Sequence, residues 1–169
     1  MKYPIRTRVL HWLTAIAVFT TLLIGFTMTN SVAWHGALLA AHLTLGVLIL
    51  LIVIVRIANR FSHKTPALPA TVGRLEAKIA MGSELSLYAL LVIQPLVGWA
   101  MLSAAGLPIR VFDGIPLPRI VPFDAQLYGV LREAHSVLAY LLVAAVAAHV
   151  SAVLLHTLTL RDGMLRRML

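Results

Sequence analysis

The sequence predicts an all-α integral membrane protein, a four-helix bundle that crosses a lipid bilayer four times. Apolar residues make up 60% of the 169 residues and charged residues only 12%, whereas about a quarter of a soluble domain is charged. The apolar residues fall in four runs, each long enough to cross roughly 30 Å of hydrocarbon. The runs lack the alternation of barrel strands, and open sheets cannot span lipid, so each run is expected to be a helix.

The first two runs predict helices at about residues 9–28 and 34–57. The first follows three basic residues and could be mistaken for a secretory signal. No small-residue cleavage site follows it, however, and His11 would be unusual inside a signal. The second begins at Trp34, an aromatic residue of the kind that gathers at a membrane edge. Both runs are therefore interpreted as membrane spans.

The third and fourth runs predict helices at about residues 83–104 and 134–160. Pro95 should kink the third helix, because proline removes one backbone hydrogen bond. The segment 105–133 contains prolines that argue against a long helix there. We therefore expect a long connection between these two helices on the outer side.

The basic residues flank the apolar runs unevenly, and this predicts the orientation of the chain. Eleven of the 14 lysines and arginines precede the first run, separate the second from the third, or follow the fourth. The other three, Arg110, Arg119 and Arg132, lie between the third and fourth runs. We therefore expect a multi-pass protein with both termini in the cytoplasm. The net charge of +8 reflects this flanking, so we expect no nucleic-acid partner.

The chain has no cysteine, and this narrows its metal chemistry. Iron–sulfur clusters, zinc thiolate sites, covalent haem attachment and a lipoprotein anchor all need cysteine. Any metal site must therefore use histidine or carboxylate. With 7 histidines against 6 acidic residues, histidine is the expected ligand.

Four histidines, His11, His42, His135 and His149, lie inside the apolar runs, where an ionisable group is costly and indicates function. His135 and His149 are 14 residues apart in one predicted helix, a rotation of about 1400°, or about 40° short of four turns. They therefore share a helix face at two depths about 21 Å apart. Two metal centres stacked across a membrane need this arrangement.

The direction in which each helix enters the membrane predicts the partners of these two histidines. His42 should lie at the outer depth with His135, and His11 at the inner depth with His149. Each pair could supply two imidazoles to one haem iron, with the flat porphyrin between helices. Two alternatives stay open. The histidines could only pack helices together. They could also bind zinc or copper, although two histidines at each depth would leave the coordination shell of such a metal incomplete.

Several segments carry a resemblance to a known family. They are Val9-Leu10-His11-Trp12-Leu13, Ala41-His42-Leu43-Thr44-Leu45-Gly46, the spacing from His135 to His149, and Leu160-Arg161-Asp162-Gly163-Met164-Leu165-Arg166-Arg167-Met168. Together they resemble the bacterial cytochrome b561 family, which includes superoxide:ubiquinone oxidoreductases, over essentially the whole chain. The resemblance implies a bacterial inner (plasma) membrane protein that exchanges electrons with ubiquinone. It also implies two haems b, with the four intramembrane histidines as their iron ligands.

Two further residues are candidates for quinone chemistry. Members of the family carry a histidine early in the third helix, where this chain has Glu84. Glu84 could deliver protons as quinone is reduced, or it could snorkel or pair with an inner-face arginine. His156 lies two turns past His149 and closer to the cytoplasm, where it could bond a quinone carbonyl or touch lipid headgroups.

The ligation predicts the type of reaction. A haem held by two imidazoles has no open coordination site, so electrons must pass through the porphyrin edge. Superoxide is a one-electron donor and an anion, and Arg110, Arg119 and Arg132 could steer it to the outer haem. The same arginines could instead pair with haem propionates or with acidic neighbours.

We therefore expect an enzyme that oxidises superoxide at the outer face and reduces ubiquinone. The alternative is a di-haem electron-relay subunit that links the quinone pool to a partner dehydrogenase or oxidase. A third class is a haem-free transporter or metal permease. An absorption spectrum separates the third class from the first two, and quinone-dependent superoxide consumption separates the first from the second.

Overall fold

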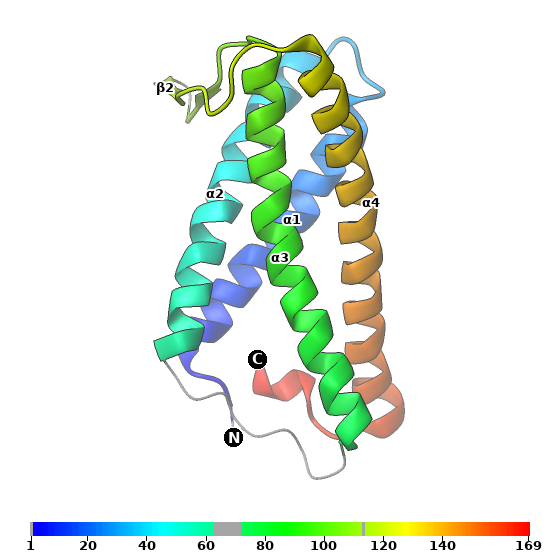
Figure 1. Cartoon of the computed structure of the whole chain (residues 1–169). Helices are drawn as coiled ribbons and strands as arrows, with labels where there is room; N and C mark the ends of the chain where they lie inside the picture. The colour runs from blue at the N-terminus through cyan, green and yellow to red at the C-terminus, as the bar shows by residue number, and fades with distance from the viewer. Residues whose placement is uncertain (1, 63–71, 113) are drawn as a thin grey trace.

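Four long helices dominate the computed structural model, which describes residues 2–62, 72–112 and 114–169 (Figure 1). The elements are α1 (Ile5–Met28), α2 (His35–Ser62), α3 (Arg74–Ala104), β1 (Arg110–Val111), β2 (Ile115–Pro116), α4 (Ala125–Leu154), a π-helical segment (Leu155–Leu160) and a 3₁₀ turn (Leu165–Arg167). The two strands pair as an antiparallel hairpin. Each long helix is long and apolar enough to span a membrane, so the predicted four-helix membrane fold is confirmed.

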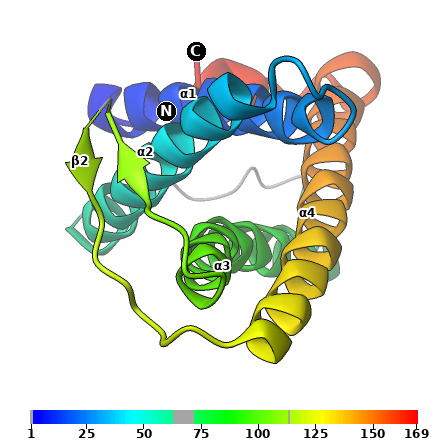
Figure 2. The ribbon, with the colours of Figure 1, turned by 90° about the horizontal axis from the view of Figure 1, so that it is seen from above.

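Successive helices run in opposite directions along the bundle (Figure 1). Both chain termini lie at one end, here called the terminal end, and the β-hairpin lies at the other, here called the hairpin end. Helix α1 packs on α2, α2 on α3, and α3 on α4. Figure 2, viewed along the bundle, shows α3 beside both α2 and α4. Because α4 runs from the hairpin end to the terminal end, it carries His135 and His149 at two different levels.

The helices are longer than the apolar runs predicted, and those bounds were wrong. Helix α1 begins at Ile5 and not near residue 9, and α2 ends at Ser62 and not near residue 57. Helix α3 begins at Arg74 and not near residue 83, and α4 begins at Ala125 and not near residue 134. The added turns are rich in polar and charged residues. Such residues can form helix outside the hydrocarbon, but a search for apolar runs does not include them. Asp124 also caps α4, because its carboxylate accepts hydrogen bonds from two amides of the first turn.

The buried core lies between the two histidine levels. It consists of Ala17, Val18, Ile49, Val53, Leu91 and Leu142. Leu142 lies midway along α4 between His135 and His149. Many large apolar side chains of all four helices are instead exposed, as expected where lipid replaces the protein interior as their surroundings.

The segment between α3 and α4 folds back over the hairpin end. Trp99 Nε1 donates a hydrogen bond to the carbonyl of Pro118 at 2.9 Å. The amide of Phe112 donates to Thr44 Oγ1 of α2 at 3.2 Å. In its described part the segment contains only the short hairpin before α4 begins, which agrees with the proline content. These bonds fix the segment that carries two of the three candidate arginines.

The C-terminal segment lies against the start of α1. The amide of Tyr3 donates to the carbonyl of Arg167, and Trp12 Nε1 donates to the carbonyl of Met168, both at 3.0 Å. The indole of Trp12 therefore ties the two ends of the chain together at the terminal end.

Candidate functional site

The four intramembrane histidines lie in two pairs, one near each end of the bundle. His42 of α2 faces His135 of α4, with ring centres 6.2 Å apart, here called the hairpin-end pair. His11 of α1 faces His149 of α4, with ring centres 6.4 Å apart, here called the terminal-end pair. The structure thus brings together the residues that the depth argument paired.

The spacing within each pair suits one metal atom between two imidazoles. Two nitrogens on opposite sides of a metal, each about 2 Å from it, place their ring centres roughly 6 Å apart. Both measured separations agree with this value. Zinc fits less well, because a zinc site needs at least three protein ligands and no metal-binding group of three His, Cys, Asp or Glu occurs in the described part of the chain.

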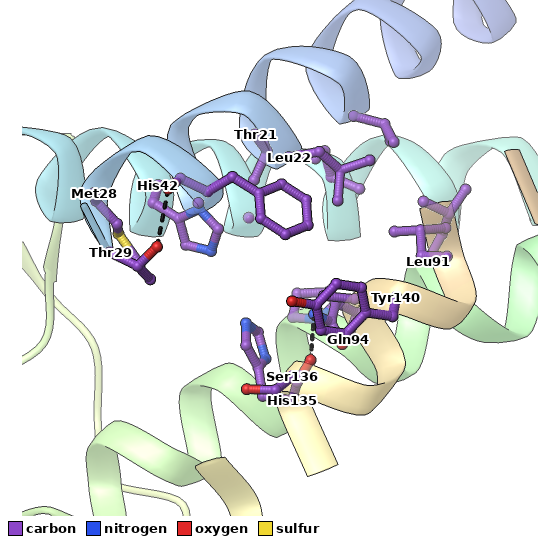
Figure 3. A pocket seen from close by; sticks show the side chains of 18 residues that line it. Thr21, Leu22, Met28, Thr29, His42, Leu91, Gln94, His135, Ser136 and Tyr140 are labelled. Carbon is purple, nitrogen blue, oxygen red and sulfur yellow. Dashed lines mark hydrogen bonds between the residues drawn. The ribbon is translucent and has the colours of Figure 1, made fainter. Parts of the chain in front are cut away.

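A cavity of about 230 Å³ lies at the hairpin-end pair (Figure 3). His42 and His135 point into it from opposite sides, and Leu22, Leu91 and Tyr140 are among the side chains around them. None of its 18 lining residues is Asp, Glu, Lys or Arg. The cavity therefore suits a flat apolar group held by two imidazoles, as the porphyrin of a b-type haem is.

One ring nitrogen in each histidine of the hairpin-end pair lacks a hydrogen-bond partner of good geometry. His42 Nδ1 and His135 Nδ1 are buried, and neither has a partner within the residues described. Leaving such a group unsatisfied costs about 1–3 kcal/mol. A metal bound through Nδ1 would give that nitrogen a partner, so the pair fits a metal-centred group such as the one that the sequence predicts.

Two glycines make room for these rings. A Cβ atom on Gly98 of α3 would lie 3.0 Å from His135 Cε1, and one on Gly25 of α1 would lie 3.2 Å from His42 Cε1. Gln94, one turn before Gly98, donates a hydrogen bond to the carbonyl of His135 at 3.0 Å. Helix α3 therefore positions His135 although it carries no histidine itself.

The terminal-end pair has a charged neighbour. Arg56 of α2 places Nη2 3.5 Å from His11 Nδ1, and its guanidinium lies over the ring of Tyr88, with Cζ 5.2 Å from the ring centre. Close by, Asn59 donates to Thr7 Oγ1 at 2.9 Å and joins α2 to α1. The two histidine levels therefore differ in charge.

A polar cluster lies beyond the terminal-end pair, here called the terminal triad: Glu76, His156 and Asp162. His156 is only 8% exposed. Its Nδ1 donates to Asp162 Oδ2 at 2.6 Å, and its Nε2 lies 3.2 Å from Glu76 Oε1. The hydrogen bond from His156 holds the pKa of Asp162 below its ordinary value. All three side chains line a cavity of about 160 Å³.

The backbone around His156 departs from the α-helix that the sequence predicted. Residues Leu155–Leu160 form a π-helical segment, and Arg161 ends it with φ 51°. The extra residue per turn brings Asp162 back beside His156. Such π segments often occur at functional sites.

Glu84 forms an ion pair with Arg60 of α2, 3.1 Å apart. Pairing with an arginine was one of the possibilities that the sequence left open for Glu84. At the hairpin end, Arg110, Arg119 and Arg132 are exposed. Arg119 donates to the carbonyl of Gly106 at 3.0 Å, and Arg132 lies one turn before His135 in α4.

The sequence reasoning missed Gly25, Gly98, Arg56, Glu76 and Asp162 as contributors to these sites. Arg56 was counted only as a flanking charge, although the predicted span 34–57 includes it, and Glu76 was not considered, because the third predicted helix began at about residue 83. An arginine about four turns past an intramembrane histidine in the same apolar run was the available signal for Arg56. The sequence carries no signal for the two glycines, because whether a glycine leaves room for a histidine ring depends on which helix it faces.

Comparisons with known proteins agree on one family. A family model described as prokaryotic cytochrome b561 matches residues 2–169. Cytochrome b561 homolog 2 of Escherichia coli (strain K12) is 25% identical over 171 residues, which cover 99% of this chain and 91% of that protein. The probable superoxide oxidase CybB of Yersinia pestis is 26% identical over 172 residues, which cover 99% of this chain and 96% of that protein. The resemblance carried by the sequence motifs is confirmed.

Proposed function

The chain belongs to the prokaryotic cytochrome b561 family, and we propose that it oxidises superoxide at the hairpin end and reduces ubiquinone at the terminal end. The observation that carries this proposal is the pairing of imidazoles at two levels of one membrane bundle, 6.2 and 6.4 Å between ring centres. His42 with His135, and His11 with His149, would each hold one b-type haem. Each bound haem would supply a one-electron carrier.

The two imidazoles at each level determine what the protein must do at each end. They would occupy the iron of a bound haem, so the chain would have to bring each substrate close to the porphyrin and not to the metal. The apolar lining of the hairpin-end cavity excludes water and keeps the two imidazoles in place. The core around Leu142 then separates the two levels within the bundle.

Superoxide is the proposed donor at the hairpin end. Arg110, Arg119 and Arg132 are exposed there, and positive charge near a site raises the local concentration of an anion. Each superoxide anion would give up one electron and leave as dioxygen. The similarity to the relative from Yersinia pestis, a probable superoxide oxidase, supports this choice.

Ubiquinone is the proposed acceptor at the terminal end. Two electrons and two protons convert a quinone to a quinol, so this end must also supply protons. In the terminal triad one ring nitrogen of His156 faces each carboxylate, so a proton can enter at one nitrogen and leave from the other. His156 would bond a quinone carbonyl by exchanging one of these two contacts, and Glu84 would share in proton delivery by leaving Arg60.

The proposed orientation places the terminal end in the cytoplasm and the hairpin end outside a bacterial inner membrane. Eleven of the 14 basic residues belong to the terminal end by sequence, as the positive-inside rule requires. Superoxide would then be oxidised outside the cytoplasm, and the protons for quinone would come from within it.

The test uses the purified chain in liposomes that contain ubiquinone. We expect two haems b per chain and superoxide consumption that depends on quinone. Arg132→Gln should slow the reduction by superoxide and weaken its dependence on salt, whereas Arg74→Gln, an exposed arginine at the opposite end, should do neither. A chain without haem would end the proposal. Two haems with no superoxide consumption would favour the electron-relay subunit instead.

A further inference from the structure

Arg56 is a cation at membrane depth beside the terminal-end pair. It is half-buried in α2, 3.5 Å from His11 Nδ1, and it rests on the ring of Tyr88. A guanidinium keeps its charge in proteins, and a cation placed over an aromatic face is held there by the ring. The charge therefore stays close to whatever group His11 and His149 hold.

The charge of Arg56 is not neutralised by a carboxylate. Of the ion pairs among the residues described, none involves Arg56. Glu84, on the facing helix α3, is paired with Arg60 one turn further along α2. The undescribed connection 63–71 contains no acidic residue. The positive charge of Arg56 is thus not cancelled by a direct ion pair within the described part of the chain.

The contact with His11 acts through charge and not through a hydrogen bond. At 3.5 Å it is too long for a strong hydrogen bond. A histidine that binds a metal through Nε2 carries its proton on Nδ1, so Arg56 would then have no lone pair to donate to. What remains in the metal-bound protein is an unpaired positive charge next to the ligand.

The hairpin-end pair has no such neighbour. Its cavity is lined by uncharged side chains, and the exposed arginines of that end lie outside the lining. An electron added to a centre is stabilised by a nearby positive charge, and this effect is strong where water and salt do not screen it. The two levels should therefore differ in their affinity for an electron.

We propose that Arg56 makes the haem centre between His11 and His149 easier to reduce than the one between His42 and His135. Electrons that enter at the hairpin end would then move toward the terminal end, where the quinone accepts them. This inference rests on the proposed function, since it needs two haem centres. It goes beyond that function by assigning the direction of electron flow to one residue that binds neither substrate.

Spectroelectrochemistry of the purified full chain tests the inference. His42→Ala should leave only the terminal-end centre and so identify its potential. That centre should be the higher of the two, and Arg56→Gln should lower its potential by at least a tenfold change in the one-electron equilibrium, about 59 mV. Arg56→Lys, which keeps the charge, should shift it far less, and Arg74→Gln, which replaces an exposed arginine in the first turn of α3, should leave it unchanged.

The outcomes separate this inference from the proposed function. A purified chain without haem overturns the proposed function. Two haems with potentials that Arg56→Gln leaves unchanged, or shifts by equal amounts, overturn only the inference. If Arg56→Gln fails to retain the terminal-end haem, the order of the two potentials in the unsubstituted chain decides: a lower terminal-end potential refutes the inference and a higher one supports it.

Discussion

The close approach of Gly98 to His135 makes a sharp prediction for Gly98→Ala. The added methyl group would lie 3.0 Å from His135 Cε1 and 3.3 Å from Nδ1, both shorter than an ordinary contact. The ring of His135 must therefore move by a few tenths of an ångström, away from α3 and toward the cavity that it lines. Ligand sets work within roughly 0.5 Å of their productive geometry, so this shift uses most of the tolerance.

The expected result is a selective loss at the hairpin end. Overpacking costs about 1–3 kcal/mol, and a disturbed supporting shell lowers metal-site affinity by about 10- to 100-fold. Haem per chain, measured from the pyridine haemochrome, should fall from two toward one. Gly25→Ala, whose methyl group would lie 3.2 Å from His42 Cε1, should have the same effect in weaker form.

A glycine in the same helix provides the control. A Cβ atom on Gly82 of α3 would meet nothing within 4 Å, so Gly82→Ala tests the helix propensity of alanine without crowding a histidine. Gly82→Ala should keep both haems. If Gly98→Ala also keeps both, with unchanged affinity, then His135 is not held in the position argued here and the role of α3 in the site is refuted.

Three further predictions address other parts of the molecule. His149→Ala should remove the terminal-end haem and leave the hairpin-end haem, which haem analysis and low-temperature spectra would show; loss of both or neither would contradict the pairing. The hydrogen bond from His156 lowers the pKa of Asp162 from its ordinary 3.8. This hydrogen bond should therefore stabilise the fold at pH values above 3.8, and the stabilisation should be lost as the pH falls through the lower pKa of the folded state. Thermal unfolding in detergent from pH about 6 to about 3 should show this loss, and Asp162→Asn should lack it. Trp99→Phe removes the hydrogen bond to Pro118, so it should destabilise the fold by about 1 kcal/mol without changing the haem content, as unfolding and haem analysis can check.

The fold was predictable because a bilayer imposes a length and a composition on each span. Four apolar runs were enough to identify four helices, and their order was enough to give the antiparallel arrangement. The helix ends were less predictable, since Arg74 and Ala125 begin helices in polar sequence where the hydrocarbon rule gives no signal. Asp124, an ordinary N-cap residue just before α4, was a signal that a search based on hydropathy passed over.

The paired histidines were predictable and their surroundings were not. The sequence gives both the spacing of two histidines in one helix and the depth of each histidine in the membrane. His135 and His149 could therefore be assigned partners at matching depths. The contacts of Gly98, Arg56 and Glu76 depend instead on how each helix is rotated about its axis. The π-helical segment before Arg161 changes that rotation locally, and it brings Asp162 to His156 in a way that a regular helix would not.

The unequal chemistry of the two ends argues for one direction of electron flow over the other. Reducing a quinone consumes protons, so the reducing end needs groups that can hold and pass them. At the terminal end His156 joins two carboxylates beside a cavity. At the hairpin end Asp124 is already committed to capping α4, and it accepts two amide hydrogen bonds that protonation would weaken. In the terminal triad Glu76 likewise accepts an amide hydrogen bond, from Gly73 at the start of α3, but the two ring nitrogens of His156 face two carboxylates and can pass a proton between them. No carboxylate described at the hairpin end pairs with a histidine in this way, so the terminal end is better suited to supply the protons for quinone.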